Sequence, residues 1–320
     1  MLALGIFSIM MNLAECGRGK MEATEPASMP SVLPEYAVEY QGKYYLPRED
    51  LQTILIMGLD KNEHERPDNS IAYTNGMQSD FLMLLILDEE AKVCDVLHLN
   101  RDTMTEIPGL GGGGGDTGTF IGQLALAHTY GSGGSDSCIN AKKAVSNLLG
   151  GVTIDHYVTL TMDAVVALND LVGGVTLTLM EDFTEFDPAM KKGAELTLKG
   201  DQALTYVRFR MTIGDGGNTG RMKRQEQYLR AFYTRLMEKN RESEDFLLLA
   251  LRSVNDSFTS DLSVNQLDQL GKILSACTLN PFRSLEGKTV RREESYEFYA
   301  DQDALQKTVR DLFYTDWQRD

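Results

Sequence analysis

One segment of the chain, residues 199–241, differs in charge from the rest of the sequence. It carries ten basic residues against four acidic ones, a net charge of +6 in a protein whose formal net charge is -16. Apolar and basic residues alternate over residues 206–210, which predicts an extended stretch with Arg208 and Arg210 on the same side. Guanidinium groups pair with phosphate oxygens through two parallel hydrogen bonds and stay charged at any physiological pH. The segment therefore predicts a site for a phosphate-bearing ligand.

A helix is predicted to begin at Gly220, shortly after these two arginines. In this helix Arg221, Arg224 and Gln225 stand at positions i, i+3 and i+4, which places them on one face. The start of a helix also offers backbone N–H donors that favour an anion. The other basic residues of the segment are expected to pair with surface carboxylates, chiefly Lys223, Arg230, Arg235 and Lys239.

Charged residues also follow predicted strands. Continuous apolar runs predict three buried strands, which cover residues 53–59, 81–87 and 93–99. The first strand ends at Asp60, and the third is followed by Arg101 and Asp102. Ligands of α/β proteins usually bind where strands end. We therefore expect these side chains to belong to the same site as the arginines.

The order of predicted strands and helices indicates the fold class. Further strands are predicted over residues 156–160 and 175–179, a small hairpin over residues 38–46, and helices over residues 124–130, 141–149, 163–171, 246–251, 262–274 and 303–313. Residues 61–79 and the glycine-rich residues 109–118 are predicted to be loops. The alternation predicts an α/β protein, an α-β-α sandwich around a central mixed sheet. Residues 36–320 are assigned to this single domain.

Composition and motif content exclude several classes of protein. With 42% apolar and 24% charged residues over 320 residues, the chain is globular and long enough to bury a core. The net charge of -16 argues against a general nucleic-acid-binding surface, because phosphate would be repelled by the mean field. The cysteines and histidines form neither a C-x-x-C nor an H-E-x-x-H pattern, and no P-loop or nucleophile-elbow motif occurs. Zinc ribbons, zincins, P-loop NTPases and α/β-hydrolases are therefore not expected.

The N-terminal residues have a character of their own. Residues 1–16 contain an apolar stretch shorter than the roughly 20 residues that span a bilayer, but it matches the core of a signal peptide or the remnant of an anchor. Residues 17–35, with three prolines among small and polar residues, are predicted to be a linker. We therefore expect export or membrane attachment. Cys138 and Cys277 could pair outside the cell, but buried free thiols are the preferred interpretation.

Five short motifs occur in a defined order along the chain. They are Gly58-Leu59-Asp60, Ser79-Asp80, Arg101-Asp102-Thr103, Tyr206-Val207-Arg208-Phe209-Arg210 and Gly220-Arg221-x-x-Arg224-Gln225. In this order they resemble the motifs of the LytR-CpsA-Psr (LCP) family, and the resemblance extends over residues 36–315. Several motifs in order are more specific than any one of them alone.

The resemblance implies an extracytoplasmic protein that is anchored to the cell membrane, faces the cell wall and has an α/β sandwich fold. It implies a phosphotransferase that moves an anionic glycopolymer, of the teichoic-acid or capsule kind, from a polyprenyl-pyrophosphate carrier to a sugar hydroxyl of peptidoglycan, with Mg²⁺. Motif matching assigns pyrophosphate binding to Arg101, Arg208, Arg210, Arg221, Arg224 and Gln225.

The resemblance also implies roles within the site. Arg101, Arg208, Arg210 and Arg221 are expected to act in catalysis, and Asp102 either orients Arg101 or accepts the proton of the acceptor hydroxyl, the orienting role being favoured. Asp80 and Asp60 are the expected metal ligands, since Mg²⁺ prefers hard carboxylate and phosphate oxygens.

Three positions depart from the family pattern, and one of them is Asn100, where the family often has Pro or Ser before the Arg-Asp-Thr motif. The other two leave an alternative open. The family usually has an arginine where this chain has Gln78 and an acid where it has Asn218. The alternative is a non-catalytic module that binds polyprenyl phosphate or pyrophosphate. A transcriptional regulator, an older description of the family, fits neither the net charge nor the expected export. The apolar stripe after Gly220 forms either a groove for the polyprenyl chain or plain core, and it contains Tyr228, Leu229, Phe232, Tyr233 and Leu236.

Overall fold

A computed structural model describes residues 34–61, 74–110, 115–210, 212–214, 216–243, 246–293 and 295–317. The predicted apolar segment of residues 1–16 and nearly all of the predicted linker lie outside these residues. No helix within the described ranges is both long and apolar enough to cross a bilayer.

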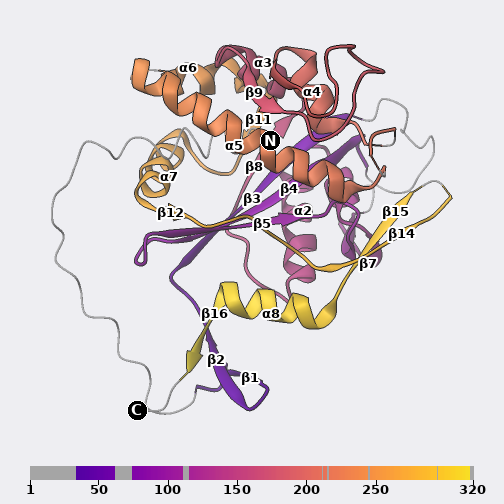
Figure 1. Cartoon of the computed structure of the whole chain (residues 1–320). Coiled ribbons are helices and arrows are strands. Elements are labelled where there is room, and N and C mark those ends of the chain that lie inside the picture. Colours follow the sequence, from indigo (N-terminus) through magenta and orange to yellow (C-terminus); the bar gives the residue numbers. More distant parts are fainter. Residues whose placement is uncertain are drawn as a thin grey trace.

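A seven-stranded mixed sheet forms the centre of the molecule (Figure 1). Its order is β11 (Phe258–Ser260), β8 (His156–Thr161), β3 (Leu51–Lys61), β4 (Met77–Asp88), β5 (Val93–Leu99) and β12 (Thr278–Leu279), and β13 (Arg283–Ser284) also pairs with β5. Strand β3 runs parallel to β8 and antiparallel to β4. The predicted hairpin of β4 and β5 is confirmed, but β4 begins at Met77, within the segment predicted to be a loop.

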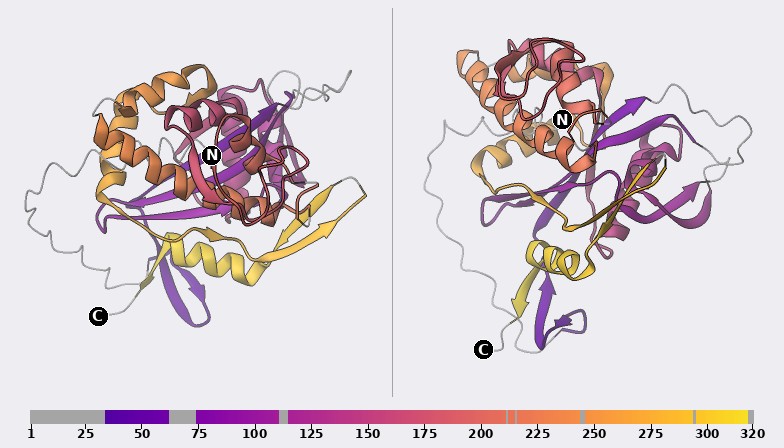
Figure 2. Two further views of the ribbon diagram at one scale, coloured as in Figure 1. Left: turned by 45° about the horizontal axis from the view of Figure 1, so that its top comes forward. Right: turned by 45° about the vertical axis from the view of Figure 1, so that its right-hand side comes forward.

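Alternate residues of the central strands enter two different cores. In β4, Phe81, Met83 and Leu85 belong to one core, whereas Leu82 and Leu84 belong to the other. The apolar runs of the sequence are continuous because both faces of the sheet are buried. The first core is covered by α3 (Asp163–Leu171), α4 (Asp201–Arg208), α5 (Asn218–Glu242), α6 (Phe246–Ser253) and α7 (Val264–Ala276). The second is covered by the 3-10 helix η1 (Leu124–Thr129), α2 (Ser135–Leu148) and α8 (Gln302–Phe313). This arrangement is the predicted α-β-α sandwich (Figures 1 and 2).

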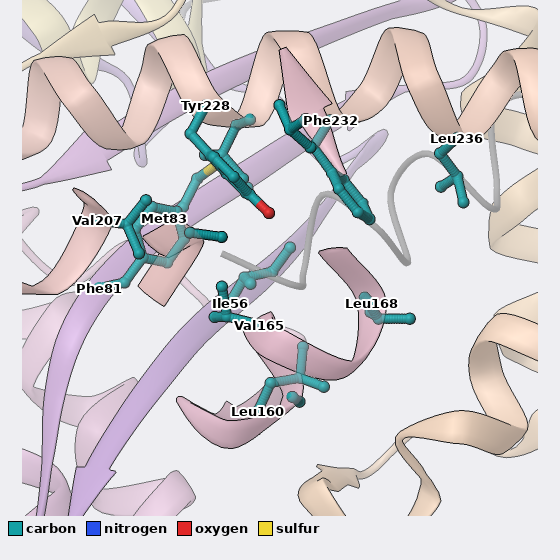
Figure 3. Close-up of a cluster of buried hydrophobic side chains, with 14 of the residues drawn as sticks. Ile56, Phe81, Met83, Leu160, Val165, Leu168, Val207, Tyr228, Phe232 and Leu236 are labelled. Atoms are coloured by element: carbon teal, nitrogen blue, oxygen red, sulfur yellow. The ribbon is translucent and has the colours of Figure 1, made fainter. Parts of the chain in front are cut away.

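The apolar stripe of α5 packs into the first core. Tyr228, Phe232 and Leu236 project from the helix into the cluster that also contains Ile56 and Met83 of the sheet (Figure 3). Leu229 is also buried, and Tyr233 packs against the cluster. Of the two interpretations of this stripe, the structure therefore supports plain core. Cys138 lies in the opposite core from Cys277, and both are buried free thiols, as preferred.

Smaller sheets surround this centre. The predicted N-terminal hairpin consists of β1 (Val38–Tyr40) and β2 (Lys43–Pro47), extended by β16 (Tyr314–Trp317). Three further two-stranded sheets are β6 (Met104–Leu110) with β7 (Asp116–Gln123), β9 (Val175–Thr178) with β10 (Glu195–Leu198), and β14 (Gly287–Arg291) with β15 (Tyr296–Ala300). The prediction of a loop over residues 109–118 is therefore wrong at both of its ends, where the glycine-rich segment belongs to the hairpin of β6 and β7. A short helical turn, η2 (Asn255–Ser257), precedes β11.

The prediction of an extended stretch over residues 206–210 is wrong. Residues 201–208 form α4, and the chain becomes extended only at Phe209, which ends that helix. Tyr206 and Val207 directly precede Arg208, and both are buried on the core side of α4. The next helix, α5, begins at Asn218, two residues before the predicted start.

Candidate functional site

A cavity of about 560 Å³ lies where β3, β4 and β5 meet the end of α4 and the start of α5. It is lined by Asp60, Asp80, Arg101, Glu185, Phe186, Arg208, Phe209, Arg210, Thr212 and Arg221. Asp60 is the last but one residue of β3, Asp80 lies near the start of β4, and Arg101 is the second residue after β5. Six of the residues singled out in the sequence therefore meet at one edge of the sheet, as the positions of the strand ends predicted.

Asp80 is held between two arginines. Its carboxylate oxygens lie 2.6 Å from Nη1 of Arg101 and 3.1 Å from Nη1 of Arg221. Burial disfavours the charged form of Asp80, but the positive charges of Arg101 and Arg221 outweigh burial and hold the pKa of this carboxyl below its usual value. Asp80 therefore remains ionised and keeps both guanidinium groups in place.

Asp60 forms a second ion pair, with Arg208. Nε and Nη2 of Arg208 donate to the two carboxylate oxygens of Asp60 at 2.7 and 3.0 Å. Burial raises the pKa of Asp60; Arg208 opposes this shift, and the negative charge of Asp80 adds to it. The two carboxylates are therefore near enough to repel each other across the cavity.

Asp102 lies behind the cavity and is almost fully buried. Nη1 of Arg210 donates to its Oδ2 at 2.6 Å, and Nε of Arg101 lies 3.8 Å from its Oδ1. Asp102 is not among the cavity-lining residues. These contacts are those of a residue that orients Arg210 and Arg101.

Two buried asparagines fix the position of Arg221. Oδ1 of Asn218 accepts a hydrogen bond from Nε of Arg221 at 2.9 Å, and Nδ2 of Asn218 donates to Oδ1 of Asn100 at 2.7 Å. The same Asn100 oxygen accepts from the backbone N–H of Asp102 at 2.9 Å. The sequence did not single out either asparagine as a site residue. The sequence marked them only as departures from the family pattern, one residue before Arg101 and three before Arg221.

Arg221 carries a guanidinium nitrogen that no described residue of the chain satisfies. Burial lowers the pKa of Arg221 to about 10, although the charge of Asp80 opposes the shift, so the side chain is still cationic at neutral pH. Its Nη2 is buried and has no hydrogen-bond partner among the described residues. Buried donors are rarely left unsatisfied, and an anionic oxygen in the cavity would satisfy this one.

Arg224 and Gln225 lie behind the cavity and do not line it. Arg224 donates to the carbonyl oxygens of Tyr206 and Phe209 and pairs with Glu181 at 2.8 Å. Nε2 of Gln225 donates to the carbonyl oxygen of Val207 at 3.1 Å. These carbonyls belong to the last turn of α4 or directly follow it, where a helix leaves its carbonyl groups unpaired. Arg224 and Gln225 therefore cap α4 and hold the backbone that carries Arg208 and Arg210.

An exposed aromatic pair adds an apolar part to the cavity wall. The rings of Phe186 and Phe209 lie 4.4 Å apart, and the two residues are 41% and 39% exposed. The pair was not predicted, because Phe186 is far from the arginine motif in the sequence. A cavity with clustered arginines and exposed phenyl rings suits an amphiphilic anion.

Asp60 and Asp80 are the carboxylates of the cavity that could take part in holding a metal ion. Within the described ranges, no group of three or more His, Cys, Asp or Glu side chains is arranged to hold a metal by itself. Asp60 and Asp80 nevertheless line one cavity and repel each other, and Mg²⁺ in proteins is commonly held by one or two carboxylates together with substrate phosphates.

Two curated proteins are similar to the chain over more than half of its length. It is 31% identical over 183 residues to a protein of Halalkalibacterium halodurans named polyisoprenyl-teichoic acid–peptidoglycan teichoic acid transferase TagU, a match that covers 57% of this chain and 52% of that protein. It is 28% identical over 238 residues to the biofilm regulatory protein A of Streptococcus mutans, with 72% of this chain and 55% of that protein covered. The chain spans between 52% and 64% of the length of three such relatives.

The fold is shared with solved structures. One of them, TagT bound to LI-WTA, matches with a TM-score of 0.61 at 20% identity, over 82% of this chain and 90% of that chain. The family model that describes LytR_cpsA_psr proteins matches residues 20–313, which include every element around the cavity. The chain therefore belongs to the LytR_cpsA_psr family.

Proposed function

We propose that the protein transfers an anionic glycopolymer from a polyprenyl-pyrophosphate carrier to a sugar hydroxyl of peptidoglycan. The observation that carries this proposal is the convergence of four arginines and two aspartates on one cavity that also exposes two phenyl rings. A relative named as a polyisoprenyl-teichoic acid–peptidoglycan teichoic acid transferase supports it. Because the acceptor would be part of the cell wall, the proposal places the domain outside the cytoplasmic membrane, attached through its N-terminal segment.

The arginines supply what phosphoryl transfer needs most, which is positioning and neutralisation of charge. In the proposed reaction, the acceptor hydroxyl oxygen attacks the phosphorus that bears the glycopolymer, and the bond from this phosphorus to the oxygen of polyprenyl phosphate breaks, while the hydroxyl proton passes to the departing phosphate or to solvent. Arg101 and Arg208 bind the pyrophosphate, and Nη2 of Arg221 donates to the leaving phosphate. Asp102 keeps Arg210 directed at the site.

Asp60 and Asp80 would hold the magnesium ion, which would supply further positive charge to the pyrophosphate. Both carboxylates are paired with arginines in this structure. The ion pairs hold the carboxylates and the guanidinium groups side by side at the cavity. The carboxylates would then bind the cation while the guanidinium groups bind the phosphate oxygens.

A non-catalytic binding module is the second candidate, and Gln78 is the residue that favours it. A neutral amide here replaces the guanidinium group that the family usually has, so the site contains one positive charge fewer. Its Oε1 accepts a hydrogen bond from Nη2 of Arg101 at 2.5 Å, which occupies a donor that would otherwise be available to phosphate. Asn218, the other departure, supports Arg221 instead of weakening it. Turnover therefore distinguishes the two candidates.

The first experiment measures turnover by the purified protein. A synthetic polyprenyl-pyrophosphate-linked donor and a peptidoglycan acceptor are supplied with and without Mg²⁺, and released polyprenyl phosphate is quantified. Mg²⁺-dependent release together with the ligated product is expected. Tight binding of the donor without any release would instead establish the binding module.

A second experiment locates the site by equilibrium binding of a polyprenyl pyrophosphate. Arg208→Ala and Arg221→Ala are expected to weaken binding at least tenfold, since each removes a charge-assisted contact. Lys223→Ala is the matched control, because Lys223 is exposed on the same helix and its loss changes the net charge equally. Unchanged affinity in both arginine variants would remove the cavity from consideration as the binding site.

A further inference from the structure

The hairpin of β14 and β15 is hydrogen-bonded to Asp102, which lies behind the cavity. The backbone N–H of Phe298 donates to the carbonyl oxygen of Asp102 at 2.8 Å, and Thr103 forms a bridge with Phe298. Tyr296 and Phe298 are buried, and Nε2 of Gln123 donates to the carbonyl oxygen of Tyr296 at 2.5 Å. From this attachment the hairpin extends away from the body of the molecule (Figure 2, left).

One tyrosine of this hairpin contacts two arginines. Cζ of Arg210, which lines the cavity, lies 5.7 Å from the centre of the Tyr296 ring. Cζ of Arg291, which pairs with Tyr296 across the hairpin, lies 5.9 Å from the same centre. The two guanidinium groups are therefore separated by no more than the sum of these distances, a span that a short glycan can bridge. Tyr296 thus links the cavity to the hairpin through two cation–π contacts.

Arg291 has no carboxylate partner among the residues that the structure describes, unlike its neighbour. Among the described residues, no Asp or Glu forms an ion pair with Arg291, whose side chain is exposed and held by the ring of Tyr296. Arg292, the next residue, pairs with Glu297 at 2.7 Å. Arg291 therefore presents its positive charge to solvent in a fixed place beside the cavity, where binding an anion would cost little side-chain entropy.

We propose that Arg291, held by Tyr296, forms a second anion subsite, which binds the first negatively charged group of the glycopolymer beyond the pyrophosphate. The inference rests on the proposed function, because it takes the pyrophosphate to lie at Arg210 and its neighbours. The glycan then leaves the cavity along the hairpin, and its first phosphodiester or carboxylate group reaches Arg291. The subsite would make the protein select donors whose glycan is charged close to the carrier.

The test compares two donors by equilibrium binding to the full chain. Both carry a polyprenyl pyrophosphate and a short glycan; the glycan of one is neutral, and that of the other bears a phosphodiester or, in a separate arm, a carboxylate. Arg291→Ala is expected to weaken binding of the charged donors about five- to tenfold and to leave binding of the neutral donor unchanged. Arg291→Lys is expected to restore part of the affinity. The arm with the larger loss identifies the anion that the subsite prefers.

Arg292→Ala is the matched control, because it removes the same charge from the next residue, whose side chain is already paired with Glu297. Equal losses in Arg291→Ala and Arg292→Ala would overturn the subsite, since they would reflect only the overall charge of the hairpin. Equal losses for neutral and charged donors would overturn it as well. A different result would contradict the proposed function alone: the wild-type protein would bind the charged donors more tightly than the neutral donor but would never release polyprenyl phosphate.

Discussion

Arg221 and Arg224 stand three residues apart on the same face of α5, yet they meet different surroundings. Both side chains are almost fully buried. Arg221 faces Asp80 and the cavity, and one of its nitrogens has no partner within the described part of the chain. Arg224 meets the carbonyl groups of Tyr206 and Phe209 and the carboxylate of Glu181 instead. One turn of helix thus separates a group available to a ligand from a group that holds the fold together.

This difference follows from where α4 ends. The carbonyl groups of its last turn need partners, and Arg224 and Gln225 supply them. Once α4 is capped in this way, Arg208 at its last position and Arg210 just beyond it are held at the cavity. The motif Arg221-x-x-Arg224-Gln225 therefore serves both the ligand site and the fold. Substitution of Arg221 should lower activity, whereas substitution of Arg224 should lower stability.

The largest effect is expected from Arg221→Lys, measured as turnover of the lipid-linked donor. An ammonium group cannot contact Asn218, Asp80 and a phosphate oxygen in the fixed geometry of the guanidinium fork. Loss of a positioned group that stabilises transition-state charge costs about 10²–10³-fold in rate, so we expect turnover to fall by that factor. Thermal unfolding of the same variant checks that it is folded. Turnover within tenfold of the wild-type value would mean that Arg221 is not part of the reacting site.

Arg224→Met should act on stability. The substitution keeps an apolar stem but leaves the Tyr206 and Phe209 carbonyls and Glu181 without their partner. Breaking a buried ion pair from one side costs about 3–5 kcal/mol, and Glu181 is partly exposed, so we expect a loss of about 3 kcal/mol in the free energy of unfolding. Chemical denaturation measures it. A loss below about 1 kcal/mol, combined with abolished donor binding, would instead place Arg224 among the ligand-binding residues.

The strand ends carried most of what the sequence predicted correctly. Asp60 and Arg101 were expected together because each follows an apolar run, and a run that is buried on both faces fixes where its strand stops, whereas Asp80 was expected only from the family motif. The helical spacing of Arg221 and Arg224 was also correct. Neither pattern depends on contacts between distant parts of the chain.

The features that the sequence did not predict depend on such contacts. The alternation over residues 206–210 is also compatible with the last turn of a helix, and the choice is made by α5, whose side chains cap the carbonyls of α4. Helical spacing predicted that Arg224 lies beside Arg221, but it did not predict which partners each arginine contacts. Phe186 and Tyr296 reach the site from segments far away in sequence, and no local pattern marks them.

The smallest effect is expected at a third arginine of the same helix, Arg230, which is exposed whereas Arg221 and Arg224 are buried. Its side chain is 51% exposed, pairs with Glu226 four residues earlier at 2.9 Å and lies over the ring of Phe282. Exposed pairs of this kind contribute about 0.3–0.5 kcal/mol and an exposed cation–π contact about 0.5–1 kcal/mol. Arg230→Ala should therefore lower the free energy of unfolding by less than about 1.5 kcal/mol and leave donor turnover unchanged. The part of this loss that comes from the ion pair should be smaller at high salt, because salt screens exposed charges. A loss of turnover in this variant would show that charge anywhere on α5 matters, and the distinction between Arg221 and Arg224 would then reflect net charge and not position.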